Sequence, residues 1–217
     1  MSAAPPGVSP AFWKLVLQDP LAGATVLDVG TGSGRIALAL APHCGRVVGI
    51  ERESDLVEEA TRRAGALGIA NASFVVADAD RTDYAPLVPE PPALVTAHLF
   101  MSDALVERAA RVLRPGGALA ILSFHVDQWR ETGRPSRFAY DEERMRRVLE
   151  THGLAVEHLE VERDVRTFGS LEQALAAAIG LQERWKTDGR WVRYIKFLEQ
   201  GGRTLTRSHL IVGARRP

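Results

Sequence analysis

Short apolar runs alternate along most of this chain with longer amphipathic stretches. The apolar runs are rich in Val, Ile, Leu and Ala and have the length of buried parallel strands. The longer stretches repeat apolar residues every three or four positions, which is typical of helices that pack on one face. The expected strands are Val26–Val29, Arg46–Ile50, Ala72–Ala77, Pro91–Ala97, Ala118–Leu122, Leu154–Val161 and Thr204–Val212. The alternation of strand and helix predicts an α/β fold.

The same periodicity gives the helices. They are expected at Phe12–Leu17, Ile36–Ala41, Ser54–Ala60, Asp103–Leu113, Glu142–Glu150, Ser170–Ile179 and Asp188–Leu198. The proline-rich residues 1–10 are expected to form a loose arm, so that arm and first helix occupy 1–20. Phe12 and Trp13 either pack on the sheet or line a lid.

A glycine ladder joins the first expected strand to the helix after it. Gly30, Gly32 and Gly34 follow the pattern G-x-G-x-G. Glycine accepts positive φ and has no Cβ, so the backbone of such a turn can approach a ligand closely. The start of the helix also presents free N–H groups. A dinucleotide fingerprint would need its third glycine at the position of Arg35, and this departure weakens a nicotinamide-cofactor reading.

Acidic residues stand at the ends of the first three strands. Asp28 lies two residues before the first glycine, Glu51 follows the second strand, and Asp78 follows the third. A carboxylate accepts two hydrogen bonds at once, which suits ribose hydroxyls. An acid is a poor neighbour for a pyrophosphate and a good one for an ammonium or sulfonium group. The three acids therefore favour a cationic nucleoside over ATP.

These motifs give the chain a family resemblance. The segments Val26–Gly34, Val47–Glu51 and the Leu113–Gly117 turn resemble motifs of the class I (Rossmann-like) S-adenosylmethionine-dependent methyltransferases, of the small-molecule kind known as types 11 and 25. The resemblance is good over residues 24–122 and rests on topology elsewhere. It implies a Rossmann-like, seven-stranded, mostly parallel sheet flanked by helices, with the last strand antiparallel and a helical insertion between strands six and seven.

The resemblance implies S-adenosylmethionine as cofactor and S-adenosylhomocysteine as product. The loop residues expected to receive the aminocarboxypropyl tail are Gly30, Thr31, Gly32 and Gly34. Asp28 is expected to support that end of the site. Ala97, at the end of the fourth strand, is expected to face the donor methyl.

The resemblance also places the nucleoside. Glu51 is expected to hold both ribose hydroxyls, and Arg52 to pack on the adenine. Asp78 is expected to accept a hydrogen bond from the adenine amino group, and the Ala79 N–H to face a ring nitrogen.

No single catalytic residue is assigned, since methyl transfer is an in-line displacement that depends mainly on alignment. His98 is a general base, a substrate partner or a wall residue of the pocket. His125 and Tyr140 are the other catalytic candidates, and with Trp129 and Arg137 they are candidates to touch the acceptor. Family members that methylate exocyclic amines often carry an Asn-Pro-Pro-Tyr motif, which is absent at His98–Met101. This difference argues against nucleic-acid bases and glutamine as acceptors.

Segments 123–140 and 163–200 are the candidate acceptor-site or lid segments of a single domain spanning 1–217. The first contains Arg130, Arg134 and Arg137, which either pair with an anionic acceptor or form a solvated charged loop. No family motif matches 168–200.

Composition narrows the class of partner. Lys+Arg and Asp+Glu number 27 each, so no net positive field gathers nucleic acid or an anionic membrane. The sequence contains no apolar run long enough to span a bilayer, and its single cysteine, Cys44, fits a reducing cytoplasm. We identify no metal-ligand set. We therefore expect a cytoplasmic monomer or homodimer with a small-molecule acceptor.

Two other functions remain open at this point. An NAD(P)-dependent oxidoreductase uses a related sheet, and a catalytically silent methyltransferase-like protein would keep the fold as a binding module.

Overall fold

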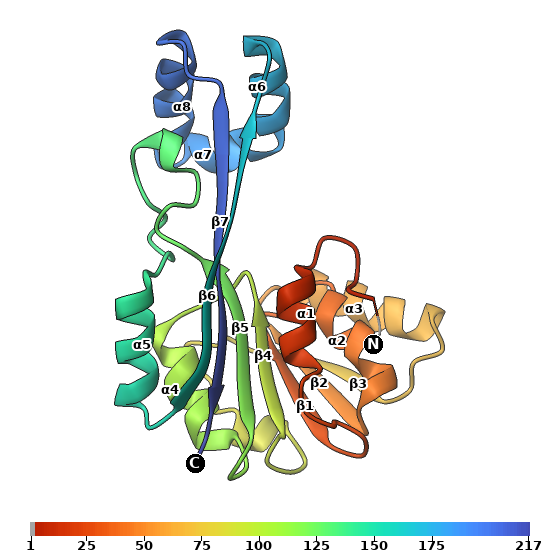
Figure 1. Cartoon of the computed structure of the whole chain (residues 1–217). Coiled ribbons are helices and arrows are strands. Elements are labelled where there is room, and N and C mark those ends of the chain that lie inside the picture. Colours follow the sequence, from red (N-terminus) through yellow and green to blue (C-terminus); the bar gives the residue numbers. More distant parts are fainter. Residues whose placement is uncertain (1–2) are drawn as a thin grey trace. The chain divides into compact units, whose positions relative to one another are not determined.

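A computed structural model describes residues 3–217, and its strands form one seven-stranded sheet (Figure 1). The strand order is β3-β2-β1-β4-β5-β7-β6. The strands are β1 (Thr25–Val29), β2 (Arg46–Glu51), β3 (Ala72–Val76), β4 (Leu94–His98), β5 (Ala118–Phe124), β6 (Ala155–Thr167) and β7 (Thr204–Arg215). The helices are α1 (Pro10–Val16), α2 (Arg35–Leu40), α3 (Ser54–Ala66), α4 (Asp103–Val112), α5 (Glu142–Thr151), α6 (Leu171–Ala178), α7 (Gln182–Lys186) and α8 (Arg190–Glu199).

The central strands are parallel. β1 pairs with β2 on one side and β4 on the other, so that Asp28 is level with Gly49 and with Thr96. β3 pairs parallel with β2, and β5 pairs parallel with β4. β7 is antiparallel, and helices flank the sheet. The predicted Rossmann-like sheet, with a helical insertion between β6 and β7, is confirmed.

The chain folds into two compact units. The first unit consists of the chain up to Ser123 together with Glu142–Glu160 and Ile211–Pro217. The second unit consists of Phe124–Asp141 and Val161–Leu210. Each unit has its own hydrophobic core: aliphatic side chains of β1, β2, α1 and α2 fill the first, and the second gathers aromatic side chains around Trp185.

The amino-terminal segment packs on the first core. The Val8 N–H donates to the Pro5 carbonyl over 3.0 Å, and the Val8 side chain is buried. Phe12 and Trp13 of α1 are buried in the same core, so of the two alternatives for this helix the structure shows packing. The expected loose arm is therefore wrong for residues 5–10, while Met1 and Ser2 lie outside the described residues.

β6 and β7 are longer than the sequence pattern indicates. β6 continues from the predicted end at Val161 to Thr167, and β7 continues from Val212 to Arg215. The segment Val161–Thr167 is mostly exposed and charged, so it lacks the apolar alternation that reveals a strand. Among the described residues, no helix is long and apolar enough to cross a membrane.

Candidate functional site

The glycine loop connects β1 to α2 at the carboxyl edge of the sheet. Gly30, Gly32 and Gly34 have φ values of 68°, 54° and 82°, all in the left-handed region that favours glycine. A Cβ on Gly30 would lie 3.0 Å from the Phe100 ring, and one on Gly34 would lie 3.1 Å from the Phe74 ring. A Cβ on Gly32 would meet no atom within 4 Å. The middle of the loop therefore faces open space, whereas its two ends are packed.

Asp28 lies directly beneath this loop. Its side chain is 1% exposed, and the Thr31 hydroxyl donates to Oδ2 over 2.5 Å. Burial raises the pKa of Asp28 from 3.8 to about 7, against the opposing effect of hydrogen bonds from Thr31 and the Ala37 backbone, while the nearby Glu51 charge raises it further. Because it is so deeply buried, the Asp28 carboxyl contacts Thr31 of the loop and presents no exposed surface of its own.

Glu51 is held at the end of β2 by backbone donors. Oε2 accepts the Gly32 N–H over 3.1 Å, and Oε1 accepts the N–H groups of Arg52 at 2.8 Å and Glu53 at 3.3 Å. The side chain is half-buried, so its orientation is fixed while part of it remains accessible. A carboxylate offers about four acceptor positions, which leaves room for a ligand hydroxyl.

The third acid stands after β3. Oδ1 of Asp78 accepts the Asp80 N–H over 2.9 Å, and Oδ2 lies 3.7 Å from the Arg81 guanidinium. Ala79 is buried, and its carbonyl accepts the hydroxyl of the fully buried Tyr84 over 2.9 Å, which anchors this turn. The Arg52 side chain at the end of β2 is largely exposed and pairs with its neighbour Glu53 at 3.0 Å.

The end of β4 carries the remaining predicted residues of the first unit. Ala97 is fully buried, and the His98 ring is half-buried with its centroid 5.6 Å from that of Phe12. Leu99 has a φ of 60°, although a branched residue strongly disfavours this region. Its N–H donates to the Leu122 carbonyl over 2.7 Å, which holds the strained turn in place. Strain of this kind clusters at functional sites.

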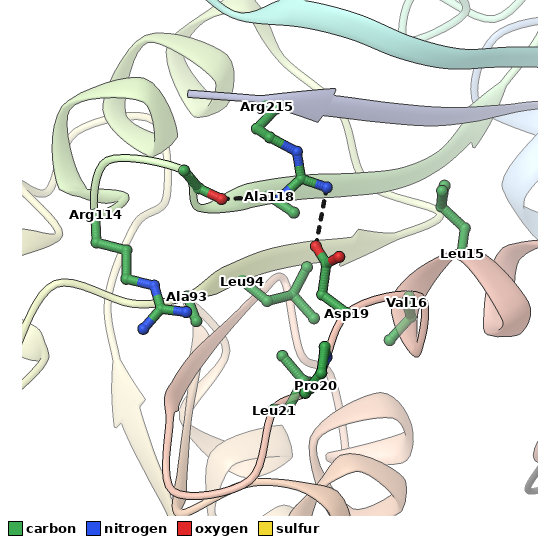
Figure 2. A pocket seen from close by; sticks show the side chains of 11 residues that line it. Leu15, Val16, Asp19, Pro20, Leu21, Ala93, Leu94, Arg114, Ala118 and Arg215 are labelled. Atoms are coloured by element: carbon green, nitrogen blue, oxygen red, sulfur yellow. Dashed lines mark hydrogen bonds and ion pairs between the residues drawn. The ribbon is translucent and has the colours of Figure 1, made fainter. Parts of the chain in front are cut away.

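A cavity of about 370 Å³ in the first unit lies at the other edge of the sheet (Figure 2). It is lined by Ala93, Leu94 and Ala118, which stand at the amino ends of β4 and β5. Across it Arg215 pairs with Asp19 at 2.9 Å. Parallel α/β sheets bind ligands at the carboxyl ends of their strands, and none of the predicted site residues lines this cavity.

Comparison with known proteins decides the family. The family described as "Methyltransferase domain" matches residues 21–189, which is most of the chain. The chain belongs to this methyltransferase family.

The relatives of this methyltransferase domain are matched over part of their length. A protein-L-isoaspartate O-methyltransferase from Ignicoccus hospitalis is 36% identical over 102 residues, covering 46% of each chain. An S-adenosyl-L-methionine-dependent Diels-Alderase from Talaromyces variabilis is 31% identical over 106 residues, covering 46% of this chain and 36% of the relative. The chain thus spans less than half the length of these curated relatives.

Solved structures show the same fold. A protein from Bacillus halodurans, assigned provisionally as a methyltransferase, is 20% identical with a TM-score of 0.70. The similarity covers 96% of this chain and 100% of that one. At 20% identity, this similarity shows a shared fold and nothing further.

The other two catalytic candidates, His125 and Tyr140, lie in the second unit. His125 and Tyr140 pair in an isolated β-bridge, and both side chains are buried. The His125 Nδ1 is 2.9 Å from the Ser208 hydroxyl, and the Asp127 N–H points to the same nitrogen over 3.3 Å. The structure thus brings His125 and Tyr140 together in one unit and the predicted cofactor residues together in the other.

Sequence reasoning missed the buried arginine of the second unit. Arg190, at the start of α8, is 6% exposed and its guanidinium lies 5.2 Å from the centre of the Trp129 ring. The sequence feature that could have indicated this ion pair is Asp188, two residues before Arg190. The Arg190 Nε donates to its two carboxylate oxygens at 3.0 and 2.9 Å.

Proposed function

We propose that this methyltransferase domain binds S-adenosylmethionine at the carboxyl ends of β1 to β4 and methylates a small-molecule acceptor. The main support is the position of the Glu51 carboxylate. The Gly32 N–H holds it by a hydrogen bond, and a Cβ on Gly32 would meet no protein atom, so the carboxylate lies beside the open side of the loop. A ligand with a ribose fits this arrangement because oriented carboxylate oxygens and uncovered backbone stand together. The neutral net charge supports a small acceptor over nucleic acid.

Each predicted residue has a role in this proposal. Glu51 accepts the two ribose hydroxyls, and Asp78 accepts a hydrogen bond from the adenine amino group. The Ala79 N–H faces an adenine nitrogen, and the exposed Arg52 covers the ring. The backbone of Gly30, Thr31, Gly32 and Gly34 receives the amino-acid tail.

The bound cofactor supplies an electrophilic methyl group on a positively charged sulfur. The protein contributes alignment, which is worth on the order of 7–11 kcal/mol in well-oriented reactions. Ala97 forms the wall nearest the transferred group, and His98 orients the acceptor or takes its proton. Asp28 adds negative charge beneath the loop, which favours a cationic ligand.

We further propose that the whole chain serves one methyltransferase activity, with 24–122 as the donor-binding core. Segments 123–140 and 163–200 then serve acceptor recognition. A cytoplasmic location is part of this proposal, since the only cysteine, Cys44, is free.

One relative gives a second function a specific basis. The Talaromyces protein is named as a Diels-Alderase that depends on S-adenosyl-L-methionine, so a cofactor site of this kind can accompany another reaction. The family match decides against the NAD(P)-dependent reductase.

Calorimetric titration of the full chain with S-adenosylhomocysteine, and separately with NAD⁺, tests the proposed site. We expect saturable binding of the first compound only. Binding of NAD⁺ alone, or of neither compound, contradicts the proposal. Incubation with methyl-labelled cofactor and pooled small-molecule acceptors then separates methyl transfer from a site that binds without transferring.

A further inference from the structure

The second unit contains a buried guanidinium with an unused donor. Asp188 engages Nε of Arg190 at 3.0 and 2.9 Å and Nη2 at 2.7 Å. Nη1 is buried and has no hydrogen-bond partner. Arg190 as a whole is 6% exposed. Buried donors nearly always have an acceptor, so this orphan atom points to a partner that the chain itself does not supply.

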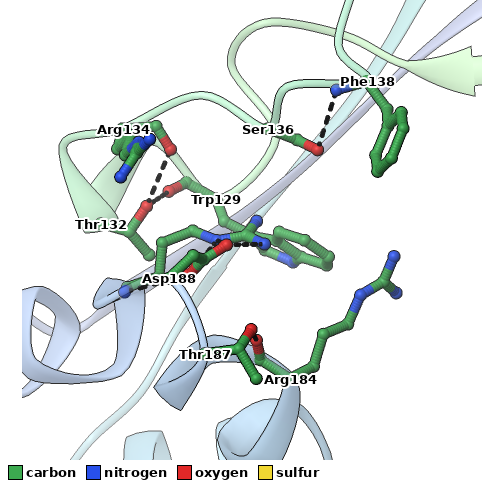
Figure 3. Close-up of polar contacts among 9 residues, drawn as sticks. Trp129, Thr132, Arg134, Ser136, Phe138, Arg184, Thr187 and Asp188 are labelled. Atoms are coloured by element: carbon green, nitrogen blue, oxygen red, sulfur yellow. Dashed lines mark hydrogen bonds and ion pairs between the residues drawn. The ribbon is translucent and has the colours of Figure 1, made fainter.

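The surroundings of this atom are positive and aromatic. The Arg190 guanidinium lies 5.2 Å from the centre of the Trp129 ring, and the Trp129 ring is 5.4 Å from the Phe124 ring. The guanidinium of Arg184, a residue of α7, lies 6.0 Å from the centre of the Phe124 ring. In the described part of the chain, no carboxylate pairs with Arg184. In Figure 3 the Arg184 side chain extends from α7 towards the Trp129 ring.

A third positive charge stands nearby. The guanidinium of Arg134 contributes, after the hydrogen bond from Arg190, to holding the pKa of Asp188 below its usual range. The guanidinium groups of Arg190 and Arg134 thus act on the one Asp188 carboxylate, which leaves excess positive charge there. Guanidinium forks bind carboxylate and phosphate groups preferentially.

The backbone holds Trp129 in a costly conformation. Its φ is 57°, in the left-handed region. The Trp129 N–H donates to the Thr206 carbonyl over 3.0 Å, and the Trp129 carbonyl accepts from both the N–H and the hydroxyl of Thr132 at 2.9 Å. The structure therefore maintains this ring position at a conformational cost, which is common where a side chain serves a ligand.

We propose that Arg184 and Arg190 bind an anionic group of the acceptor, with the Trp129 and Phe124 rings against its flat apolar body. This inference rests on the proposed function and specifies its substrate class as aromatic or planar acids. The anionic group is a carboxylate or a phosphate, and separate titrations with benzoate and with inorganic phosphate distinguish the two.

The indole N–H signals of the full chain provide a direct test by ¹H–¹⁵N NMR. The chain has four tryptophans, of which Trp13 lies in the first unit and serves as an internal reference. Benzoate and inorganic phosphate are titrated separately, at ionic strength held constant with chloride. Single Trp→Phe variants assign the signals.

We expect saturable shifts of the Trp129 signal with benzoate, with phosphate or with both, and no shift of Trp13. Arg184→Gln should weaken this binding about tenfold, because one charged hydrogen-bond donor is lost. The matched control is Arg193→Gln, an exposed arginine of α8, which should bind like the original chain. Since Arg184 is exposed, its replacement is compatible with folding.

Three results overturn the inference. The first is no saturable shift with either anion, and the second is an anion affinity in Arg184→Gln equal to that of the original chain. The third is a loss of affinity in Arg193→Gln as large as in Arg184→Gln. Titration of the same samples with S-adenosylhomocysteine keeps the two proposals apart. Loss of anion binding with intact S-adenosylhomocysteine binding rejects the acid-binding site alone. Anion binding without S-adenosylhomocysteine binding rejects the proposed function.

Discussion

The Thr31 hydroxyl donates a hydrogen bond of 2.5 Å to Oδ2 of Asp28 beneath the glycine loop. This contact links the loop backbone to a carboxyl that burial makes hard to ionise. A protein that kept Asp28 for stability alone would be better served by a neutral residue. A buried carboxyl with a raised pKa beside this loop fits the role proposed for Asp28, which is to favour a cationic ligand.

The pH dependence of stability should reveal this cost. The pKa of Asp28 is about 7 in the folded chain and 3.8 in the reference state, so the folded chain binds more protons between these values. The contribution of Asp28 to the free energy of unfolding therefore falls as pH rises from about 4 to about 7. The full difference corresponds to roughly 4 kcal/mol. We expect Asp28→Asn to unfold at a higher temperature than the original chain at pH 8, with the gap closing towards pH 4.

Thermal unfolding of the original chain, Asp28→Asn and Asp164→Asn across this pH range checks the expectation. Asp164→Asn removes one carboxyl at an exposed position of β6 and is the matched control. If Asp28→Asn and the original chain show parallel pH profiles, Asp28 is not the group that titrates. Asp28→Asn should nevertheless bind S-adenosylmethionine at least about tenfold more weakly, because a negative charge beneath the loop is lost.

Replacement of Glu51 should separate binding from folding. Glu51→Gln removes a charged acceptor and should weaken S-adenosylhomocysteine binding about tenfold or more, since such hydrogen bonds contribute about 1.5–3 kcal/mol. Glu58→Gln is the matched control, because Glu58 is an exposed carboxylate of α3 with no role in the proposed site. Calorimetric titration measures both affinities. Equal affinities in the two variants would rule out the role assigned to Glu51.

The open space at Gly32 gives a steric test. Gly32→Ala adds a methyl group that meets no protein atom, so the only cost to folding is strain at a φ of 54°. Gly68→Ala introduces comparable strain, at a φ of 67°, in the turn after α3, also with nothing within 4 Å. We expect similar losses of stability, of about 1 kcal/mol, from the two variants. Only Gly32→Ala should weaken cofactor binding, as measured by the thermal shift with S-adenosylhomocysteine, and equal shifts in both would contradict a ligand at the loop.

Much of the first unit could be predicted because its sequence signals are local. The glycines at 30, 32 and 34 require positive φ, and the acids at the strand ends stand out against apolar strands. Adjacent parallel strands then bring Asp28 and Glu51 to one edge without further information.

The second unit could not be predicted in the same way. The outer part of β6, at Val161–Thr167, is exposed and charged, so it carries no strand periodicity. The burial of Arg190 depends on Trp129, about 60 residues away, and on the unusual φ of Trp129. Val8 in a proline-rich segment was likewise buried by a contact that composition does not reveal. Such long-range packing overrides local preference.

The most direct test of the central claim is a crystal structure of the chain with S-adenosylhomocysteine. We expect the ribose hydroxyls on the Glu51 carboxylate and the amino-acid tail against the backbone of Gly32. Density for the compound away from both residues, or a Glu51 carboxylate bound only to the backbone N–H groups it now accepts, would contradict it.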